Sequence, residues 1–316
     1  MSAGARLPGA PEPTRFWPGA GGITLAGDEW GPREGPLVIL LHGGGQTRHA
    51  WRDVGATLGH AGYRAVAFDA RGHGDSGWAP DGRYTQDAMV DDLVHVVEGL
   101  GNARPALVGA SMGGGTSLVA AGEDRVDATG LVLVDIAPRV EPEGVARIRA
   151  FMLQKPEGFD TLEEVADAIA SYQPQRPRPR NLDGLAKNLR RDAEGRYRWH
   201  WDPRFLDRQV DVALRQQRFE ASAARLALPV LLVRGGMSDV LTEEGAREFL
   251  ALCPHAEYVN VRQAGHMVAG DRNDVFGQAV IDFLGRAVPV DGAPVHPPHA
   301  PGVHRPWPAG DLNDVP

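Results

Sequence analysis

Short, continuous apolar runs alternate with segments of helical periodicity along most of this chain. Runs of this kind, apolar at nearly every position, are typical of parallel strands buried on both faces, and the helical segments between them supply the crossovers. The sequence therefore predicts an α/β fold with a mostly parallel, doubly wound sheet. The expected strands are residues 37–41, 63–68, 106–108, 131–134, 230–233 and 256–261.

This alternation stops in the middle of the chain, where apolar residues recur at helical spacing and no buried-strand run occurs. We interpret this stretch as a helical cap inserted into the sheet domain. The predicted division is a first core part at 1–138, the cap at 139–227, a second core part at 228–287 and a proline-rich, poorly ordered tail at 288–316. The first thirteen residues, rich in Gly, Ala and Pro, are expected to form a loose arm.

The segment Gly109-Ala110-Ser111-Met112-Gly113 joins one of the predicted strands to a predicted helix. In that context Gly-x-Ser-x-Gly indicates a sharp turn with a serine at its tip, because glycines allow the two backbones to approach closely. The helix that starts there directs backbone N–H groups toward the same place. Ser111 is therefore the candidate nucleophile.

Two residues that a serine mechanism needs follow later strands. His266 is the expected general base, since histidine is the only side chain with an unperturbed pKa near neutrality. Its imidazole needs an acid to fix the tautomer. Asp239 is the favoured acid, because its loop is long and contains two glycines; Asp135, which also ends a strand, is the competing choice.

Backbone donors for an oxyanion are expected from the N–H of Met112 and from the glycine-rich loop after residues 37–41, with Gly44 preferred over Gly45. His42 is expected to brace that loop. For the aromatic segment 196–202, packing of the cap and lining of a substrate pocket are both open. The candidate pocket residues are Gly45, Trp199, Trp201 and Met267.

Composition excludes several other classes of function. A net charge of −8 argues against nucleic acid or an anionic membrane as a main partner, and no apolar run is long enough to span a bilayer. Residues 1–17 lack the apolar segment of a secretory signal, so a cytoplasmic location is expected.

The single cysteine, Cys253, is expected to be a core residue. The glycines and Arg71 in segment 69–76 favour a salt-bridged turn over a metal site.

Together these motifs resemble the α/β-hydrolase superfamily, in its capped branch, over roughly residues 15–284. The resemblance is carried by His42-Gly43-Gly44-Gly45, the elbow around Ser111, Ser238-Asp239 and Gly265-His266, in the order Ser, Asp, His. It implies an α/β-hydrolase fold and a carboxylesterase acting on a small-molecule ester, without a cofactor. Serine at position 111 disfavours epoxide hydrolases and dehalogenases, which use an aspartate.

Three alternatives remain open within the superfamily. They are cleavage of a C–C bond in a diketone-like substrate, which Arg198 and Trp199 would favour, a cofactor-free perhydrolase, and a small-molecule receptor without catalysis. The oligomeric state and the identity of the substrate are not indicated by the sequence.

Overall fold

A central eight-stranded sheet organises the protein. The computed structural model describes residues 3–101, 103–174, 178, 182–207, 210–266 and 273–290. The strands follow the order β11-β10-β7-β6-β4-β5-β3-β2. Neighbours from β11 to β5 in this order pair in parallel, whereas β3 is antiparallel to both β5 and β2. Their bounds are β2 Arg15–Pro18, β3 Thr24–Trp30, β4 Leu37–Leu41, β5 Arg64–Phe68, β6 Ala106–Ala110, β7 Gly130–Val134, β10 Val230–Gly235 and β11 Glu257–Val261. The predicted doubly wound sheet is confirmed.

Helices cover both faces of this sheet, as its fully buried strands require. On one face α1 (Arg52–His60) and α9 (Asn273–Ala287) share an apolar cluster with the sheet. The other face is covered by α2 (Gln86–Gly99), α3 (Met112–Gly122), α6 (Val212–Ala224) and α7 (Glu243–Leu252). The carboxyl ends of the parallel strands therefore remain free to hold functional side chains.

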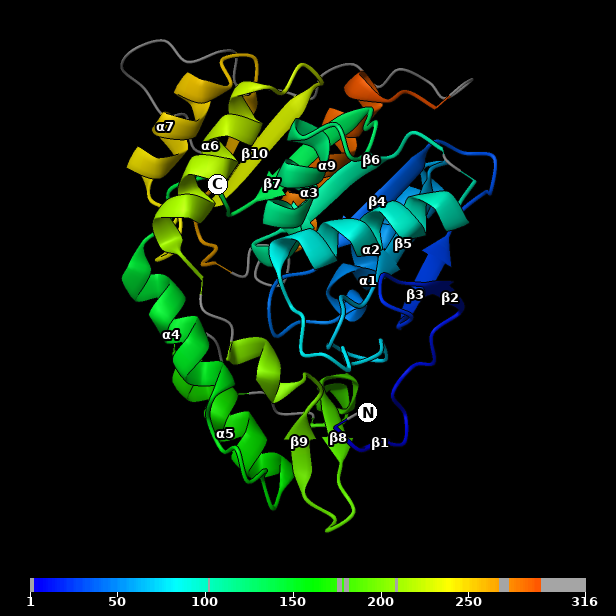
Figure 1. Cartoon of the computed structure of the whole chain (residues 1–316), viewed down its shortest axis with the longest axis vertical. Helices are drawn as coiled ribbons and strands as arrows, with labels where there is room; N and C mark the ends of the chain where they lie inside the picture. Colours follow the sequence, from blue (N-terminus) through cyan, green and yellow to red (C-terminus); the bar gives the residue numbers. More distant parts are fainter. Residues whose placement is uncertain are drawn as a thin grey trace.

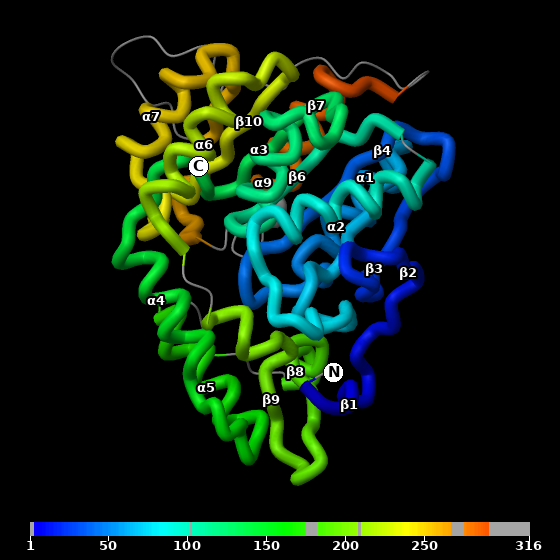
Figure 2. Tube along the Cα trace, viewed as in Figure 1, coloured from blue at the N-terminus to red at the C-terminus, as the bar shows by residue number. Residues whose placement is uncertain are grey.

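A separate layer lies beyond these strand ends, at the lower end of the molecule (Figures 1 and 2). It has its own apolar cluster, which includes Phe159, Val165 and Trp199. Its elements are α4 (Pro142–Met152), α5 (Leu162–Tyr172), the 3-10 helices η2 (Asp183–Asn188) and η3 (Pro203–Leu206), and the strands β8 (Leu189–Arg191) and β9 (Tyr197–Trp199). We refer to these elements as the cap.

The cap differs from the sequence prediction in two ways. First, it is not purely helical, because β8 and β9 form a small antiparallel sheet with β1 (Ala5–Arg6). The expectation of a loose N-terminal arm is therefore wrong for β1. Second, α6 lies inside the predicted cap range but packs against α3, and its Phe219 and Ala223 belong to the apolar cluster of the sheet. The helical pattern of the sequence does not distinguish a cap helix from a core helix.

The predicted tail is described only at its start. Val288 and Val290 pack against the cluster beneath α1 and α9. The prediction for residues 291–316 lies outside the described residues.

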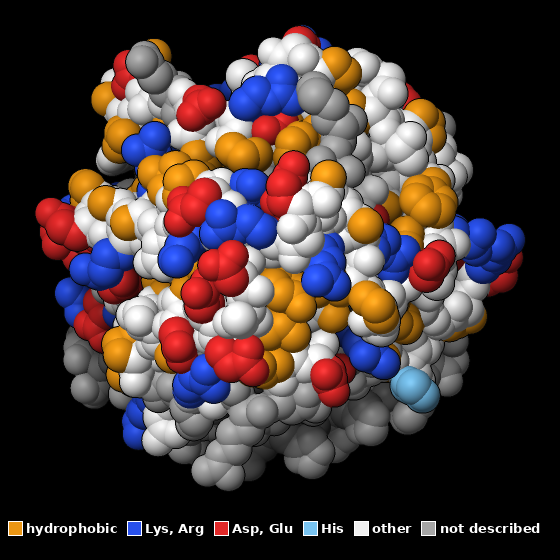
Figure 3. Space-filling view, turned by 90° about the horizontal axis from the view of Figure 1, so that it is seen from below, with side chains coloured by type: hydrophobic (Ala, Val, Ile, Leu, Met, Phe, Trp, Pro, Cys, Tyr) orange, Lys and Arg blue, Asp and Glu red, His pale blue; other side chains and the backbone are white. Residues whose placement is uncertain are grey.

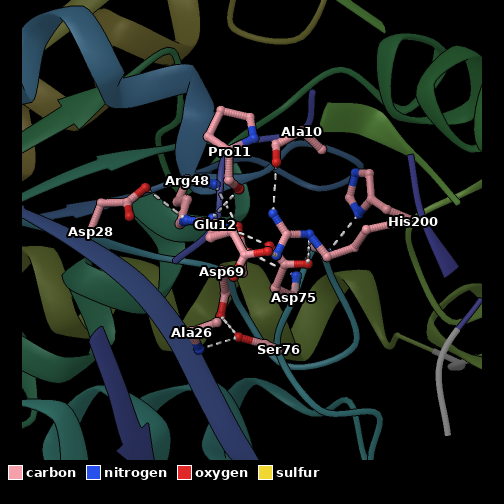
Figure 4. Close-up of polar contacts among 12 residues, drawn as sticks. Ala10, Pro11, Glu12, Ala26, Asp28, Arg48, Asp69, Asp75, Ser76 and His200 are labelled. Carbon is pink, nitrogen blue, oxygen red and sulfur yellow. Dashed lines mark hydrogen bonds and ion pairs between the residues drawn. The ribbon is translucent and has the colours of Figure 1, made fainter. Parts of the chain in front are cut away.

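A buried arginine links the sheet to the loop after β5. Arg48, from the 3-10 helix η1 (Arg48–Trp51), binds Asp69 at 2.6 Å, Asp28 at 2.8 Å and Asp75 at 2.9 Å (Figure 4). Burial by itself raises the pKa of Asp69, but Arg48 and His42, together with hydrogen bonds from the backbone N–H groups of Asp75 and Arg48, outweigh burial and hold that pKa below its usual range. Asp75 also binds Arg190 of β8 at 2.8 Å, so the network joins the core to the cap.

Replacing Arg48 tests how much this network contributes to stability. We expect Arg48→Met to lower the free energy of unfolding by about 3–5 kcal/mol, because buried carboxylates lose their counter-charge. The measurement is urea unfolding followed by circular dichroism. Arg104→Met is the control: Arg104 pairs with Asp127 on the surface, with side chains 63% and 72% exposed, and its loss should change little. Equal effects of the two substitutions would contradict this interpretation.

Candidate active site

Ser111 lies at the tip of the turn between β6 and α3, as the sequence predicts. Its φ of 47° and ψ of −111° are unusual for a residue with a side chain. The strain is held by close packing: a Cβ on Gly109 would lie 2.5 Å from the Gly113 carbonyl oxygen, and one on Gly113 would collide with the Leu41 carbonyl. The Gly113 N–H also donates to the His42 carbonyl at 3.1 Å. The hydroxyl-bearing turn is thus fixed against β4.

Asp135, directly after β7, is the acidic residue that is hydrogen-bonded to His266. The His266 Nδ1 donates to Asp135 Oδ2 at 2.7 Å. The Asp135 carboxylate, fully buried, also accepts from the Gly235 N–H at 2.8 Å and from the Ser238 hydroxyl at 2.5 Å. Three donors therefore satisfy and orient this anion. Because Nδ1 of His266 carries the hydrogen that binds Asp135, Nε2 is the imidazole nitrogen that can take a proton.

Asp239 lies elsewhere, so its predicted contact with His266 is not present. Its side chain is 45% exposed and forms an ion pair with Arg147 of α4 at 2.5 Å. The two glycines of its loop serve a different purpose: a Cβ on Gly235 would lie 2.8 Å from the Ala264 carbonyl, and one on Gly236 2.7 Å from Arg262. They let the loop after β10 pack closely against the segment that leads to His266.

The two predicted oxyanion donors border the same cavity as Ser111. Met112 and Gly44 line it, and no acceptor for either N–H is found among the described residues. The neighbouring donors are occupied, since the Gly43 N–H binds Gln46 Oε1 at 2.9 Å and the Gly45 N–H binds His73 Nε2 at 3.2 Å. These bonds favour Gly44 over Gly45 as the second donor.

Buried histidines support this loop from behind. His42 donates from Nδ1 to the Gly43 carbonyl at 2.8 Å and accepts the Ala70 N–H at 2.9 Å, which confirms its predicted bracing role. His200 of the cap accepts the Gly74 N–H at 2.8 Å and contacts the Gly45 carbonyl at 3.2 Å. Burial lowers the pKa of both His42 and His200, so both are neutral at physiological pH.

A cavity of about 730 Å³ opens over Ser111, Met112 and His266. Its size suits a small molecule. Gly45 lines it, as predicted, together with apolar residues of the cap and of α6 that the sequence pattern does not single out. These apolar residues are Val145, Ile148, Phe151, Met152, Tyr172, Phe205, Leu206, Val210, Leu214 and Phe219.

Trp199 and Trp201 do not line this cavity. They stack on each other with ring centroids 5.1 Å apart, inside the apolar cluster of the cap. Arg198 binds Asp192 at 2.6 Å, so it too is engaged within the cap. For these residues of segment 196–202 the structure therefore shows packing within the cap and not lining of the cavity. Met267 lies outside the described residues.

The segment after β5 is a salt-bridged turn, as predicted. Asp69 binds Arg48, and Arg71 binds Asp92 through two hydrogen bonds of 2.7 and 2.8 Å. Within the described ranges no group of three or more histidine, cysteine or acidic side chains could hold a metal ion.

Three further observations concern the surface, the helices and the single cysteine. Acidic and basic side chains lie interspersed on the face seen in Figure 3, without a continuous patch of either sign. No helix in the part of the chain that the structure describes is both long and apolar enough to cross a bilayer. Cys253 is buried at the end of α7, as expected.

Comparison with known proteins identifies the family of this chain. Residues 36–272 match the family of the alpha/beta hydrolase fold. The chain belongs to this family. Among its curated relatives is esterase Rv0045c of Mycobacterium tuberculosis, 31% identical over 270 residues, covering 83% of this chain and 85% of the relative.

Two further likenesses extend over the same region. The 3-hydroxybutyrate-oligomer hydrolase of Cupriavidus necator is 30% identical over 266 residues, covering 78% of this chain and 88% of the relative. A crystal structure of the M. tuberculosis esterase Rv0045c superposes with a TM-score of 0.68 at 28% identity, covering 87% of this chain and 92% of that chain. The match to the α/β-hydrolase family therefore spans most of the sheet and the cap elements after β1.

A buried histidine that stays neutral in the folded protein should make the protein less stable in acid. His49 is such a residue. Burial, with the adjacent Arg48 and Lys187, lowers the pKa of His49 to about 4, although Asp69 and Asp28 oppose the shift. The unfolded chain takes up a proton below a pH of about 6.5, while the folded protein does not until about 4. Stability should therefore fall as pH decreases across this interval.

From about pH 7.5 to about pH 5 the free energy of unfolding should therefore decrease. We expect His49→Gln to make this decrease smaller by on the order of 1 kcal/mol. The measurement is urea unfolding at several pH values. His60→Gln, at an exposed position at the end of α1, should leave the pH dependence of the wild type unchanged. An unchanged slope in His49→Gln would show that His49 takes its proton in the folded state.

Proposed function

We propose that this protein is a serine hydrolase that cleaves small-molecule carboxylic esters through an acyl-enzyme. The observation that carries the proposal is the hydrogen bond from His266 to buried Asp135 beside a strained Ser111 in one cavity. Serine alone is a weak nucleophile, and this arrangement supplies the base and the orienting acid that activate it. Asp135 replaces Asp239 in the proposed triad.

In the proposed reaction Ser111 Oγ attacks the carbonyl carbon of the ester while His266 Nε2 takes its proton. The oxyanion that forms receives hydrogen bonds from the N–H groups of Met112 and Gly44. Collapse of this intermediate breaks the bond to the alcohol, which leaves with the proton from His266. Water then attacks the acyl-enzyme, again losing its proton to His266, and the carboxylic acid is released as Ser111 regains its hydrogen. The nucleophile, the base, the orienting acid and the oxyanion donors of this scheme are all groups of the chain.

The character of the cavity supports an ester with an apolar acyl chain. Aromatic and aliphatic side chains from α4, η3 and α6 line it, among them Ile148, Phe205 and Phe219. The two named relatives, an esterase and a hydrolase of 3-hydroxybutyrate oligomers, also point to ester bonds as substrates. Because Arg198 and Trp199 face other cap residues, no observation favours cleavage of a C–C bond.

The identity of the acid can be tested by paired substitutions. Asp135→Asn should lower kcat for 4-nitrophenyl butyrate by about 10⁴-fold, because the imidazole loses its correct tautomer. Asp239→Asn should keep kcat within about threefold, since only a surface ion pair is lost. The opposite ranking would restore Asp239 to the triad.

Covalent labelling tests the nucleophile. A fluorophosphonate should add one equivalent of mass at Ser111, since only an activated serine reacts quickly. Ser111→Ala should abolish both labelling and ester turnover, with an unchanged circular dichroism spectrum as the control for folding. Ser117→Ala is the matched control and should still be labelled at Ser111. Ser117 is buried in α3, and its hydroxyl donates to the Gly113 carbonyl. Labelling that persists in Ser111→Ala would overturn the proposal, and binding without turnover in the wild type would indicate a receptor.

A further inference from the structure

Three arginine side chains are among the described residues that line the cavity, and they differ in what neutralises them. Arg218 binds Glu123 and Asp87, each at 2.6 Å. Arg149 is exposed and donates to the Leu206 carbonyl at 2.9 Å. Arg215 forms no ion pair with any described residue, and its buried Nε has no hydrogen-bond partner there.

An arginine without a partner at a cavity wall is unusual, because buried charges in proteins are normally paired. Burial lowers the pKa of Arg215, and no carboxylate of the described residues offsets the effect. The two acids that line the cavity are otherwise engaged: Asp87 binds Arg218, and Asp211 caps α6 by accepting the Leu214 N–H at 3.0 Å. Arg215 is thus the partly buried cation of the cavity wall that no described carboxylate balances, whereas Arg149 is exposed to solvent.

Packing fixes Arg215 relative to the candidate nucleophile. Its guanidinium carbon lies 5.5 Å from the centroid of the Phe219 ring. That ring contacts α3 so closely that a Cβ on Gly115 would lie 2.7 Å from it. The Gly115 N–H in turn binds the Ser111 carbonyl at 2.9 Å. A single buried ring therefore separates the cation from the first turn of the helix that follows Ser111.

Resting on the proposed esterase function, we propose that Arg215 binds a carboxylate at the far end of the acyl chain. The substrate class is then monoesters of dicarboxylic acids. The planar guanidinium can donate two parallel hydrogen bonds to a carboxylate, and the apolar walls accommodate the methylene groups between the two ends. A carboxylate fits better than a dianionic phosphate, because Arg215 is the single lining arginine among the described residues that is partly buried and has no ion pair, and the other walls are mostly apolar.

Matched pairs of esters test this assignment. Monoethyl suberate and ethyl octanoate have acyl chains of equal length, and only the former ends in a carboxylate. Hydrolysis is followed in a pH-stat at neutral pH. The wild type should prefer the acidic ester in kcat/KM. Arg215→Gln should lose about 10–100-fold on the acidic ester, the range expected for a charged hydrogen bond, and change little on the neutral one.

Two further variants complete the comparison. Arg215→Lys, which keeps the charge but not the planar geometry, should retain part of the preference. Arg225→Gln is the matched control, since Arg225 is exposed at the end of the same helix and pairs with Asp124. It should hydrolyse both esters at the wild-type rates. A wild type that prefers the neutral ester, or an Arg215→Gln that loses both activities in parallel, would overturn the assignment.

A binding measurement separates this inference from the proposed function. Calorimetric titration with suberate needs no turnover, so it reports on Arg215 even if neither ester is hydrolysed. We expect suberate to bind the wild type about tenfold or more tightly than Arg215→Gln. Equal affinities would reject the carboxylate site, whereas a difference without any ester hydrolysis would reject only the esterase mechanism.

Discussion

The carboxylate of Asp135 is the anion on which the arrangement of the site depends. It is fully buried and accepts hydrogen bonds from three donors, and these donors come from different places in the chain. The Gly235 N–H and the Ser238 hydroxyl belong to the end of β10 and its loop, and His266 follows β11. One side chain after β7 therefore joins three neighbouring strand ends and sets the direction of the imidazole.

The same contacts explain which parts of the site could be predicted from the sequence. Ser111 and His266 were identifiable because each follows a recognisable buried run and because their residue types are restricted by chemistry. The choice of acid was not identifiable in this way: β7 and β10 are adjacent in the sheet, so Asp135 and Asp239 both reach the same edge. What separates them is a positive φ of 51° at Asp135 and the orientation of Ser238 toward it, and neither leaves a sequence pattern.

Short elements and dispersed contacts account for the other differences. Strands as short as β1 and β8 contain too few residues for alternation to be detected. Aromatic residues clustered in the sequence, such as Trp199 and Trp201, pack on each other in the cap, whereas the cavity is lined by residues scattered over α4, η3 and α6. Local composition indicates that a region is apolar, but tertiary packing decides which of its side chains face the cavity.

The position of α6 has a consequence for how a ligand would be selected. This helix packs on α3 through Phe219 against Gly115 and through Ser222, which a Cβ on Gly122 would contact at 2.6 Å. Interfaces in which glycine admits a neighbouring residue this closely leave little room for sliding. The distance between Arg215 and Ser111 is therefore set by the α3–α6 packing rather than by α4 and α5 of the cap. If a carboxylate occupies one end of that span and the reacting carbonyl the other, the rigid spacing selects for the length of the chain between them. The cap then governs which side groups the chain can carry.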